Sequence, residues 1–283
     1  MQTVDSQMPV DYLVLGHVAH DLTREGPGLG GTVAYSALTA RALGMRVGVV
    51  TASGKETPLE PLQGIPVITL ESRQSTTFEN IYTEHGRVQY LRARAARLGF
   101  GCVPEAWRGA SIIHLGPIAD EMEPALPDGF SPALLGITPQ GWMRQWDSEG
   151  CVSPREWRDS ETALARADAV VISREDVGGN DESIEHMAHQ TRLLVVTEGA
   201  AGCLLYWHED RRRFRAPRVR EVDATGAGDI FATAFFVRLH ATRDPWEAAR
   251  FATLVASNSV RRIGLDGIPT AKEIQDCLVE VLA

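Results

Sequence analysis

Short apolar runs alternate with helix-like segments along most of this chain. Residues 12–16 are an apolar run that ends in glycine, and residues 46–51 are a second one. Between them, residues 32–43 have the small, mostly apolar composition of a buried helix, and Gly44 suits its C-terminal end. A strand, a helix and a strand within about forty residues form a βαβ unit, so the pattern predicts a parallel sheet.

The same alternation returns in the second half of the chain. Apolar runs of strand length are separated by segments of helix length, and the last two runs are close enough to pair antiparallel. The segment that opens at residue 230 is apolar nearly all round, which is typical of a buried helix. Strands are predicted at 111–115, 133–138, 169–172, 192–197, 203–207 and 213–215, and helices at 161–166, 182–189, 230–239, 245–261 and 271–282.

The region that follows the first βαβ unit has a different character. Residues 76–82 and 87–91 alternate polar and apolar positions around a Glu-His-Gly turn, which predicts a β-hairpin. Its polar positions indicate one solvated face, or a sheet that covers a ligand. We therefore expect one α/β domain over residues 1–283, with lid segments at 17–30 and 72–98.

The composition limits the classes of protein to consider. With 283 residues, 44% of them apolar and 23% charged, the chain can form a large globular core. A net charge of −9 argues against a nucleic-acid-binding protein, which usually presents a basic face, but not against binding of a small anion. Four widely separated cysteines indicate reduced thiols rather than a zinc site or a disulfide framework. Since neither a signal-peptide pattern nor a membrane-length apolar run is present, we expect a cytoplasmic protein that contacts no membrane.

The stretch 222–231 contains the clearest chemical signal. Gly226 and Gly228 allow backbone conformations that other residues avoid, and they bring the chain close to a ligand. An apolar helix follows at once, and the free N–H groups at its start can bind an anion. Asp229, in the first helical turn, places a carboxylate beside that anion. A proton acceptor next to a bound anion indicates phosphoryl transfer to a hydroxyl.

Residues 223–229, Asp-Ala-Thr-Gly-Ala-Gly-Asp, resemble the C-terminal signature of the PfkB, or ribokinase-like, carbohydrate kinases. The resemblance extends from just before the first predicted strand to the C-terminus. It implies a ribokinase-like three-layer α/β/α sandwich with a small β-sheet lid. It also implies that Asp229 is the catalytic base and that the amides of Gly226, Ala227 and Gly228 form the anion hole.

The resemblance also implies an acceptor side. Asp21 matches the family's Asp that binds substrate hydroxyls, and a carboxylate can accept from two hydroxyls at once. Gly30-Gly31 is similar to the glycine pair that packs against the sugar. Where the family often has Asn, this chain has Tyr35, so ribose and fructose-phosphate specificity does not carry over. Gln140 lies in a turn after a predicted strand. This turn, the glycine pair and the hairpin that begins with Thr76-Thr-Phe are together similar to the inositol-kinase branch of the family.

The donor side depends on shorter matches. Residues 196–202 follow a strand and resemble the family's T-x-G-x-x-G nucleotide loop, although a simple strand turn has the same pattern. Ser257, Asn258 and Gly264 lie where the family builds its adenine pocket. The nucleotide contacts implied in this way are Thr197, Gly199, Gly202, Thr225, Ser257 and Asn258.

Two acids are candidate metal ligands. The family commonly has N-x-x-E, linked to magnesium and phosphate, where this chain has Ser-Arg-Glu-Asp after a predicted strand. The match carries the metal role to Asp176, with Glu175 as its competitor, and oxygen ligands suit Mg²⁺. The family also admits a monovalent cation such as K⁺, here near Asp223. The eight histidines show no ligand spacing, so His17 and His20 are interpreted as loop residues.

Two other interpretations are weighed against a kinase. Residues 26–31, predicted as a loop, satisfy G-x-G-x-x-G, but Pro27 lies inside them and no acid follows at the distance that a dinucleotide-dependent oxidoreductase needs. The main alternative is a non-catalytic ligand-binding or regulatory protein that retains the kinase fold. Tyr35 and the altered motif that ends at Asp176 favour it, whereas the intact Asp229 signature argues against it. A P-loop kinase is excluded, because no G-x-x-x-x-G-K-[ST] occurs.

We expect an ATP- and Mg²⁺-dependent kinase that phosphorylates a hydroxyl of a small sugar, a cyclitol such as myo-inositol, or a nucleoside. The lid should exclude water from the site, because an open site would hydrolyse the donor. The exposed sheet of the lid is also the expected face of a homodimer. The identity of the acceptor, and which of its hydroxyls reacts, do not follow from the sequence.

Overall fold

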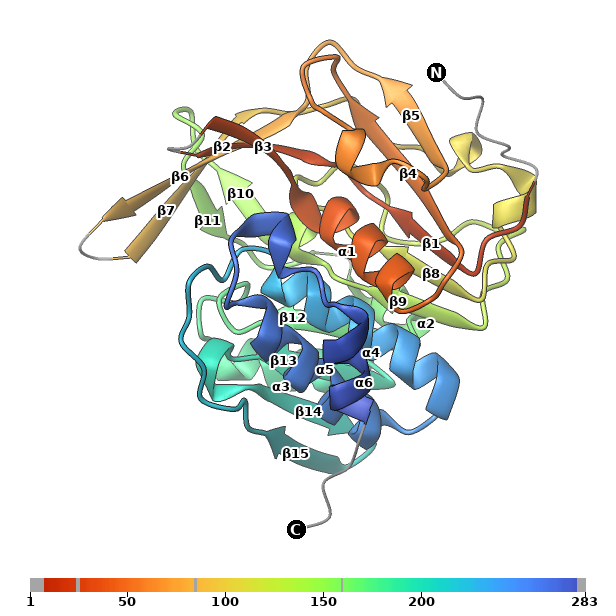
Figure 1. Cartoon of the computed structure of the whole chain (residues 1–283), viewed down its shortest axis with the longest axis vertical. Helices are drawn as coiled ribbons and strands as arrows, with labels where there is room; N and C mark the ends of the chain where they lie inside the picture. The colour runs from red at the N-terminus through yellow and green to blue at the C-terminus, as the bar shows by residue number, and fades with distance from the viewer. Residues whose placement is uncertain (1–7, 24–25, 84–85, 159, 279–283) are drawn as a thin grey trace.

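The core of the protein is a nine-stranded sheet (Figure 1). The computed structural model describes residues 8–23, 26–83, 86–158 and 160–278. The apolar runs predicted as strands all lie in this sheet. Its strands are β1 (Tyr12–Leu15), β4 (Val47–Ser53), β5 (Val67–Glu71), β8 (Ile112–Leu115), β9 (Leu134–Ile137), β12 (Ala169–Ser173), β13 (Leu193–Thr197), β14 (Cys203–Trp207) and β15 (Asp210–Phe214).

The strand order is β15-β14-β13-β12-β9-β8-β1-β4-β5. Neighbours from β13 to β5 run parallel, and β14 and β15 extend one edge antiparallel. In the centre, Tyr12 of β1 pairs with Val47 of β4 on one side and with Ile112 of β8 on the other. The predicted parallel sheet and the late antiparallel pair are both confirmed.

Helices cover both faces of the sheet, because successive side chains of a strand point to opposite sides. Along β1, Tyr12 and Val14 pack in one apolar cluster, and Leu13 and Leu15 pack in the other. None of the helices in the described part of the chain has the length and apolar character that crossing a membrane requires. The first cluster is covered by α1 (Gly31–Ala42), α4 (Ala227–Thr242), α5 (Pro245–Ser259) and α6 (Ala271–Leu278), and the second by α2 (Ser160–Arg166) and α3 (Asp181–Gln190).

Helix α4 is buried on nearly all sides, as its apolar sequence predicted. Phe231, Phe235 and Phe236 are all buried in it, and the rings of Phe231 and Phe235 stack with centroids 6.3 Å apart. Full burial of one such side chain contributes about 1.5–3 kcal/mol. The N-terminus of α4 is therefore held firmly in place by the helix behind it. The predicted last helix, 271–282, is described as far as Leu278, and its remaining residues lie outside the described part.

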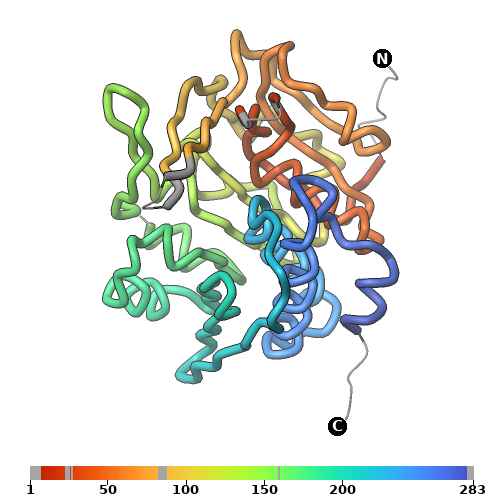
Figure 2. The backbone as a smooth tube through the Cα atoms, turned by 60° about the vertical axis from the view of Figure 1, so that its left-hand side comes forward, coloured from red at the N-terminus to blue at the C-terminus, as the bar shows by residue number. Residues whose placement is uncertain are grey.

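A second, four-stranded sheet contains most of the segments predicted as the lid and is called the lid sheet below. Figure 1 shows two of its strands projecting away from the large sheet, and Figure 2 brings this side of the molecule forward. The hairpin predicted around residues 76–91 is confirmed. The strands of this lid sheet are β2 (Ala19–Thr23), β3 (Gly26–Gly30), β6 (Thr76–Thr83) and β7 (Gly86–Ala93), in the order β3-β2-β6-β7.

The glycine-rich stretch 26–31 is a strand for most of its length, so the predicted loop was wrong. β3 pairs antiparallel with β2, with Asp21 opposite Gly28, and α1 begins directly after it at Gly31. Glycine and proline disfavour strands by themselves, and here the hydrogen-bond ladder to β2 overrides that preference. His20 likewise lies in β2 and not in a loop.

A short ribbon beside the lid was not predicted. It consists of β10 (Arg144–Trp146) and β11 (Val152–Pro154), which pair antiparallel. A bridge between Tyr90 and Cys151 joins the ribbon to β7. Strands of three residues are too short to show a period of two, so the sequence pattern did not reveal them.

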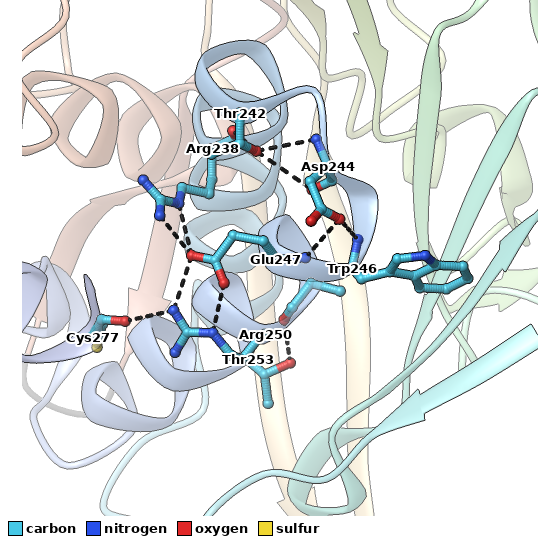
Figure 3. Close-up of polar contacts among 9 residues, drawn as sticks. Arg238, Thr242, Asp244, Trp246, Glu247, Arg250, Thr253 and Cys277 are labelled. Atoms are coloured by element: carbon cyan, nitrogen blue, oxygen red, sulfur yellow. Dashed lines mark hydrogen bonds and ion pairs between the residues drawn. The ribbon is translucent and has the colours of Figure 1, made fainter. Parts of the chain in front are cut away.

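One carboxylate and two guanidinium groups hold α4 and α5 together (Figure 3). Glu247 accepts from Arg238 at 2.7 and 2.9 Å and from Arg250 at 2.6 and 2.9 Å. Arg250 also donates to the carbonyl of Cys277 in α6 at 3.1 Å, and Asp244 caps the start of α5. Partial burial acts to raise the pKa of Glu247, but the hydrogen bonds from Arg250 and Arg238 outweigh it and lower the pKa.

Replacing this carboxylate should destabilise the protein. We expect Glu247→Gln to reduce the free energy of unfolding by about 1–3 kcal/mol at pH 7, because hydrogen bonds to a charged group are lost. A lowered pKa stabilises the fold above the unfolded-state pKa, so the difference from wild type should shrink as the pH falls below 4.5. Urea titrations at pH 7 and pH 4 measure both effects.

The matched control is Asp276→Asn, in the exposed pair of Lys272 and Asp276. It should change the free energy of unfolding by less than about 1 kcal/mol. Equal effects of the two substitutions would contradict a special role for Glu247.

Candidate active site

The strand order reverses between β1 and β8, because the chain continues from β1 through α1 to β4 on the far side. Open α/β sheets bind ligands in the crevice beyond the carboxyl ends of the strands at such a point. Gly16 and Gly116 follow β1 and β8 there. Thr138, Ser173 and Thr197 lie at the carboxyl ends of β9, β12 and β13. The candidate loops therefore meet at one edge of the sheet.

The turn before α4 presents free backbone amides. Gly226 is the N-cap of the helix in a left-handed conformation, with φ of 76°. A Cβ at this position would lie 2.2 Å from the ring of Tyr35, so only glycine fits. Within the described residues the amides of Gly226 and Gly228 have no acceptor, whereas that of Ala227 donates to the carbonyl of Ala224 at 3.2 Å. Two of the three predicted amides are thus free to bind an anion at the N-terminus of α4.

Asp229 lies in the first turn of α4, and only part of its surface is accessible. Loss of water around the carboxyl group raises its pKa to about 6, and repulsion from Asp176 acts in the same direction. A hydrogen bond from the side chain of Thr32 and the positive charge of Arg144 act to lower the pKa. The carboxyl group therefore titrates close to neutral pH, where a general base is most effective.

Arg144 and Thr32 are two site residues that the sequence did not single out. Arg144 opens β10, and its guanidinium carbon lies 5.7 Å from the ring centre of Phe78 in the lid. Its charge acts on both Asp229 and Asp176. The sequence offers only weak indications that these residues belong to the site. Arg144 is a basic residue at the end of the Gln140 turn, and Thr32 directly follows the glycine pair.

Gln140 and Asp176, predicted for different ligands, are in contact. Gln140 begins a 3₁₀ turn (Gln140–Met143) and donates from Nε2 to Oδ1 of Asp176 at 3.3 Å. The amide of Ser173 donates to Oδ2 of Asp176 at 2.8 Å. Burial raises the pKa of Asp176, and the charge of Arg144 acts against this. Glu175, the competing acid, is exposed, so the geometry favours Asp176 as the acid that faces the site.

Tyr35 is buried among three of the candidate acids. Burial raises the pKa of its phenol, and the charges of Asp21, Asp229 and Asp223 raise it further. The structure therefore places Asp21, Asp229 and Asp223 around the ring of Tyr35. A large side chain at this position leaves less room than the family's Asn would.

Asp21 reaches the site from the lid. It lies in β2, and a Cβ on Gly30 would be only 1.9 Å from its Oδ2. The absence of a side chain at Gly30 therefore lets the carboxylate lie against the backbone at the start of α1. Phe78 of β6, which contacts Arg144, is the cross-strand partner of Asp21. The lid thus contributes both an acid and an aromatic ring to the site.

Asp223 joins the signature to the segment after α5. Its carboxylate accepts from the amide of Thr225 at 2.9 Å and from the amide of Gly264 at 2.8 Å. Its own amide, and that of Val222, donate to the carbonyl of Val260. Asp223 and Thr225 therefore shape the turn itself, and a ligand-binding role for either stays a prediction.

Two of the adenine-pocket candidates, Ser257 and Asn258, form contacts elsewhere. The hydroxyl of Ser257 donates to the carbonyl of Thr253 within α5 at 2.7 Å, and Ser257 is buried. The side-chain amide of Asn258 lies 3.7 Å from the sulfur of Cys277 in α6. Neither contact connects these side chains to the Asp229 turn, so their role in nucleotide binding stays a prediction.

The predicted nucleotide loop is a tight turn after β13. Thr197 ends that strand, and a 3₁₀ turn (Gly199–Ala201) follows. The amide of Glu198 donates to the carbonyl of Gly202 at 2.8 Å, and its carboxylate is ion-paired with two arginine side chains. The turn lies at the same edge of the sheet as Asp176, where a donor phosphate would have to bind.

The described residues contain no cluster of three His, Cys, Asp or Glu side chains arranged as a metal site. Mg²⁺ is usually bound through one or two carboxylates together with substrate phosphates. Asp176 fits that arrangement, because its buried carboxyl group faces the edge of the sheet where the candidate residues gather. Asp223 fits less well, since both of its oxygens already accept from backbone amides. Magnesium at Asp176 and potassium near Asp223 stay predictions.

A buried polar chain supports the site from inside. His114 bonds through Nδ1 to the hydroxyl of Tyr12 and through Nε2 to that of Thr138, both at 2.9 Å. The hydroxyl of Tyr12 donates to that of Thr233, one turn beyond Asp229, at 3.5 Å. Burial lowers the pKa of His114 to about 3, so the ring is neutral. These side chains hold β1, β8, β9 and α4 together without placing a charge behind the Asp229 carboxyl.

Comparisons with known proteins bear on the family and the fold. Residues 154–271 match the family described as pfkB family carbohydrate kinase. A pyrophosphate-dependent kinase in the ribokinase family, solved with a pyrophosphate analog and myo-inositol, superposes with a TM-score of 0.79 at 22% identity, over 94% of this chain and 100% of that one. A ribokinase from Thermotoga maritima superposes with a TM-score of 0.71 at 20% identity, over 95% of this chain and 99% of that one. The ribokinase-like fold and the PfkB resemblance are both confirmed.

Curated relatives support the same family. A cytidine kinase from Thermococcus kodakarensis is 27% identical over 90% of this chain and 98% of its own length. A fructokinase from Klebsiella pneumoniae is 33% identical over 50% of each chain, and a probable fructokinase-5 from Arabidopsis thaliana is 31% identical over 46% of this chain and 44% of its own. The chain thus spans about half the length of these fructokinases. All three relatives are named as kinases, and residues 154–271 match the pfkB family of carbohydrate kinases.

The pKa of Asp229 predicts the acidic limb of the activity profile. A base must be deprotonated, so kcat/KM for phosphorylation should fall about tenfold for each pH unit below a pH of about 6. Arg144→Met removes a charge that lowers this pKa, so the limb should move to higher pH. Rate measurements between pH 5 and 8 test both statements.

A suitable control is Arg192→Met, which disrupts an exposed ion pair with Asp168 at the opposite edge of the sheet. It should leave the limb in place. A limb that stays in place, or moves to lower pH, in Arg144→Met would contradict the proposed proximity of Arg144 to Asp229.

Proposed function

We propose that this protein transfers a phosphoryl group from a phosphate donor to a hydroxyl of a small polyhydroxylated acceptor. Asp229 acts as the general base, and the turn of Gly226, Ala227 and Gly228 binds the transferred group. The observation that carries the proposal is the Asp229 carboxyl, with its pKa raised to about 6, at the start of a buried helix beside free amides. A base and an anion site in contact are what this transfer requires.

In the proposed reaction the acceptor hydroxyl gives its proton to Asp229. Its oxygen forms a bond to phosphorus while the bond from phosphorus to the leaving oxygen breaks. The amides of the turn and the guanidinium of Arg144 stabilise the charge on the phosphoryl oxygens. A positioned base contributes about 10²–10⁴-fold and one preorganised donor about 10²–10³-fold, so positioning of both reactants must supply much of the remainder. Mg²⁺ bound with Asp176 would neutralise charge on the donor phosphates.

For the acceptor we propose a cyclitol such as myo-inositol, or a sugar or nucleoside of similar size. Asp21 binds two of its hydroxyls, Gly30 and Gly31 allow close approach, and Gln140 contacts its far side. Tyr35 replaces the family's amide by a phenol and therefore excludes the acceptors that depend on this amide. The structural neighbour solved with myo-inositol supports a cyclitol, and the cytidine kinase and fructokinase relatives support the wider range.

For the donor we propose ATP, with Thr197, Gly199 and Gly202 beside its phosphates. Pyrophosphate is the second candidate, and one observation favours it. The segment before the signature carries Arg215, Arg218 and Arg220, which are exposed and form no ion pair within the described residues. Free guanidinium groups can bind the oxygens of a polyphosphate that carries no base, and the side chains of Ser257 and Asn258, predicted for the adenine, form contacts elsewhere. A structural neighbour is described as pyrophosphate-dependent, which supports testing both donors.

Substitution of the base tests the reaction. Asp229→Asn should reduce phosphorylation of the best acceptor by at least about a hundredfold, because the proton acceptor is lost. Transfer is measured by ³¹P NMR with ATP and with pyrophosphate, each against myo-inositol, fructose, ribose and cytidine. Asp168→Asn, an acid before β12 at the opposite edge of the sheet, serves as the control and should retain full activity.

Unchanged turnover in Asp229→Asn would remove this residue from the role of base. Acceptor binding by calorimetry with no turnover for any donor would instead support the non-catalytic ligand-binding alternative.

The lid sheet is also the proposed face of a homodimer. Leu22 of β2 and Ile81 of β6 are among the exposed large apolar side chains, at 37% and 41% exposure. Light scattering at micromolar concentration should then give twice the mass of the 30.9 kDa chain, and Ile81→Lys should give the mass of one chain. A single-chain mass for the wild type would contradict this proposal.

A further inference from the structure

His17 is a buried histidine at the point where the chain leaves the large sheet for the lid. It follows β1 by two residues and precedes β2, and its exposure is 0%. Its ring contacts two other segments that connect the large sheet with the lid sheet, one at the start of β6 and one after β7. Nδ1 lies 2.6 Å from the hydroxyl of Thr76, the first residue of β6, and Nε2 lies 2.8 Å from the carbonyl of Ala96, shortly after β7.

The partners of His17 determine which ring nitrogen carries the proton. A carbonyl oxygen can only accept, so Nε2 carries the hydrogen and donates it to Ala96. Burial lowers the pKa of His17, so the ring is neutral and Nδ1 has a lone pair that accepts from the hydroxyl of Thr76. The oxygen of Thr76 in turn accepts from the amide of Ala95 at 3.1 Å. Each polar atom of this cluster is hydrogen-bonded, and an uncharged polar ring is thereby held inside the protein.

The backbone of His17 is fixed as firmly as its ring. Its amide donates to Oε1 of Glu121 at 2.9 Å, and Glu121 is fully buried. The same carboxylate accepts from the amides of Ile118 at 3.0 Å and Ala119 at 2.7 Å, in the loop after β8. Glu121 therefore ties the exit of β1 to the exit of β8, at the point where the strand order reverses.

The chain also returns from the lid against His17. The fourth crossing is the step from β3 into α1, and a Cβ on Gly31 would lie 3.0 Å from the carbonyl oxygen of His17. Ala19 and Gly30 are paired across the start of the lid sheet. All four passages of the chain between the large sheet and the lid sheet thus meet around one residue.

We propose that His17 is a positioning residue that fixes the lid sheet over the active site, and with it the carboxylate of Asp21. The inference rests on the proposed kinase function. Asp21 lies four residues beyond His17 on β2, and its cross-strand partner Phe78 lies two residues beyond Thr76 on β6. Both lid residues that face the site therefore follow directly from the two strands that the ring joins. Loosening this junction displaces Asp21 from the acceptor and admits water to the donor.

The test compares His17→Phe, which keeps a ring but removes both nitrogens, with Thr76→Val, which removes only the hydroxyl. We expect the KM for the acceptor to rise by at least about tenfold in His17→Phe, with a smaller change in kcat, because acceptor positioning is lost more than the chemistry. Donor hydrolysis without acceptor should rise relative to transfer. His17→Gln, which can still donate and accept, should recover part of the affinity.

Hydrogen exchange separates this inference from the proposed function. The amides of β2 and the first half of β6 should exchange faster in His17→Phe and in Thr76→Val, even if no kinase activity is found for the wild type. Glu79→Gln, which breaks an exposed ion pair with Arg92 within the lid, is the control and should leave both exchange and acceptor KM unchanged. Should His17→Phe fail to fold, Thr76→Val carries the test. Unchanged exchange, or faster exchange with an unchanged acceptor KM, would overturn the proposal.

Discussion

The carboxyl group of Asp229 lies where the protein disfavours its charge, and the surrounding site depends on that constraint. The change in its pKa from 3.8 to about 6 corresponds to roughly 3 kcal/mol against the charged form. Such a position persists only because α4 is packed on nearly all sides and cannot move its first turn toward water. The same packing holds the amides of Gly226 and Gly228 rigidly beside the carboxyl group. Burial of the helix therefore fixes both the carboxyl group that we propose as the base and the amides that we propose as the anion site.

Charge balance explains why residues distant in sequence meet here. Asp21, Asp176, Asp223 and Asp229 approach one region of a chain whose net charge is already −9. A phosphate donor would be repelled by these carboxylates unless positive groups offset them. Arg144 is positioned to do so, because its charge acts on two of the four acids and it also contacts the lid. This side chain therefore connects the acids of the candidate site with the lid sheet.

The lid meets the large sheet at a small, fully hydrogen-bonded polar junction rather than across a broad apolar face. The apolar cluster beneath it is limited to a few buried residues such as Phe78, Leu91 and Ile118. Polar junctions with complete pairing are geometrically specific, whereas apolar contacts tolerate sliding. His17 and Glu121 thus fix the orientation of the lid sheet relative to the large sheet. The apolar residues contribute much of the remaining contact energy.

Features that depend on neighbouring residues could be predicted from the sequence. The strand-helix-strand alternation predicted a parallel sheet, and the spacing of glycines before an apolar helix predicted an anion site with Asp229 beside it. Each prediction depends on residues within a few positions of one another. The parallel sheet is confirmed, and the anion site stays a prediction. The resemblance of residues 223–229 to a kinase signature then extended the local prediction to a fold and a reaction class.

Tertiary structure alone decided which distant residues complete the site. Arg144 and Thr32 act on Asp229 from 85 and 197 positions away, and His17 meets its partners Thr76 and Glu121 at separations of 59 and 104. The periodicity of the sequence does not indicate contacts between residues so far apart, since these contacts arise from the order of the strands in the sheet. The strand 26–30 illustrates the same limit, because glycine and proline argue for a loop until a partner strand supplies the hydrogen bonds. The sequence thus specified the Asp229 turn that we propose as base and anion site. The packing of two sheets decided that Arg144, Tyr35 and the lid sheet surround this turn.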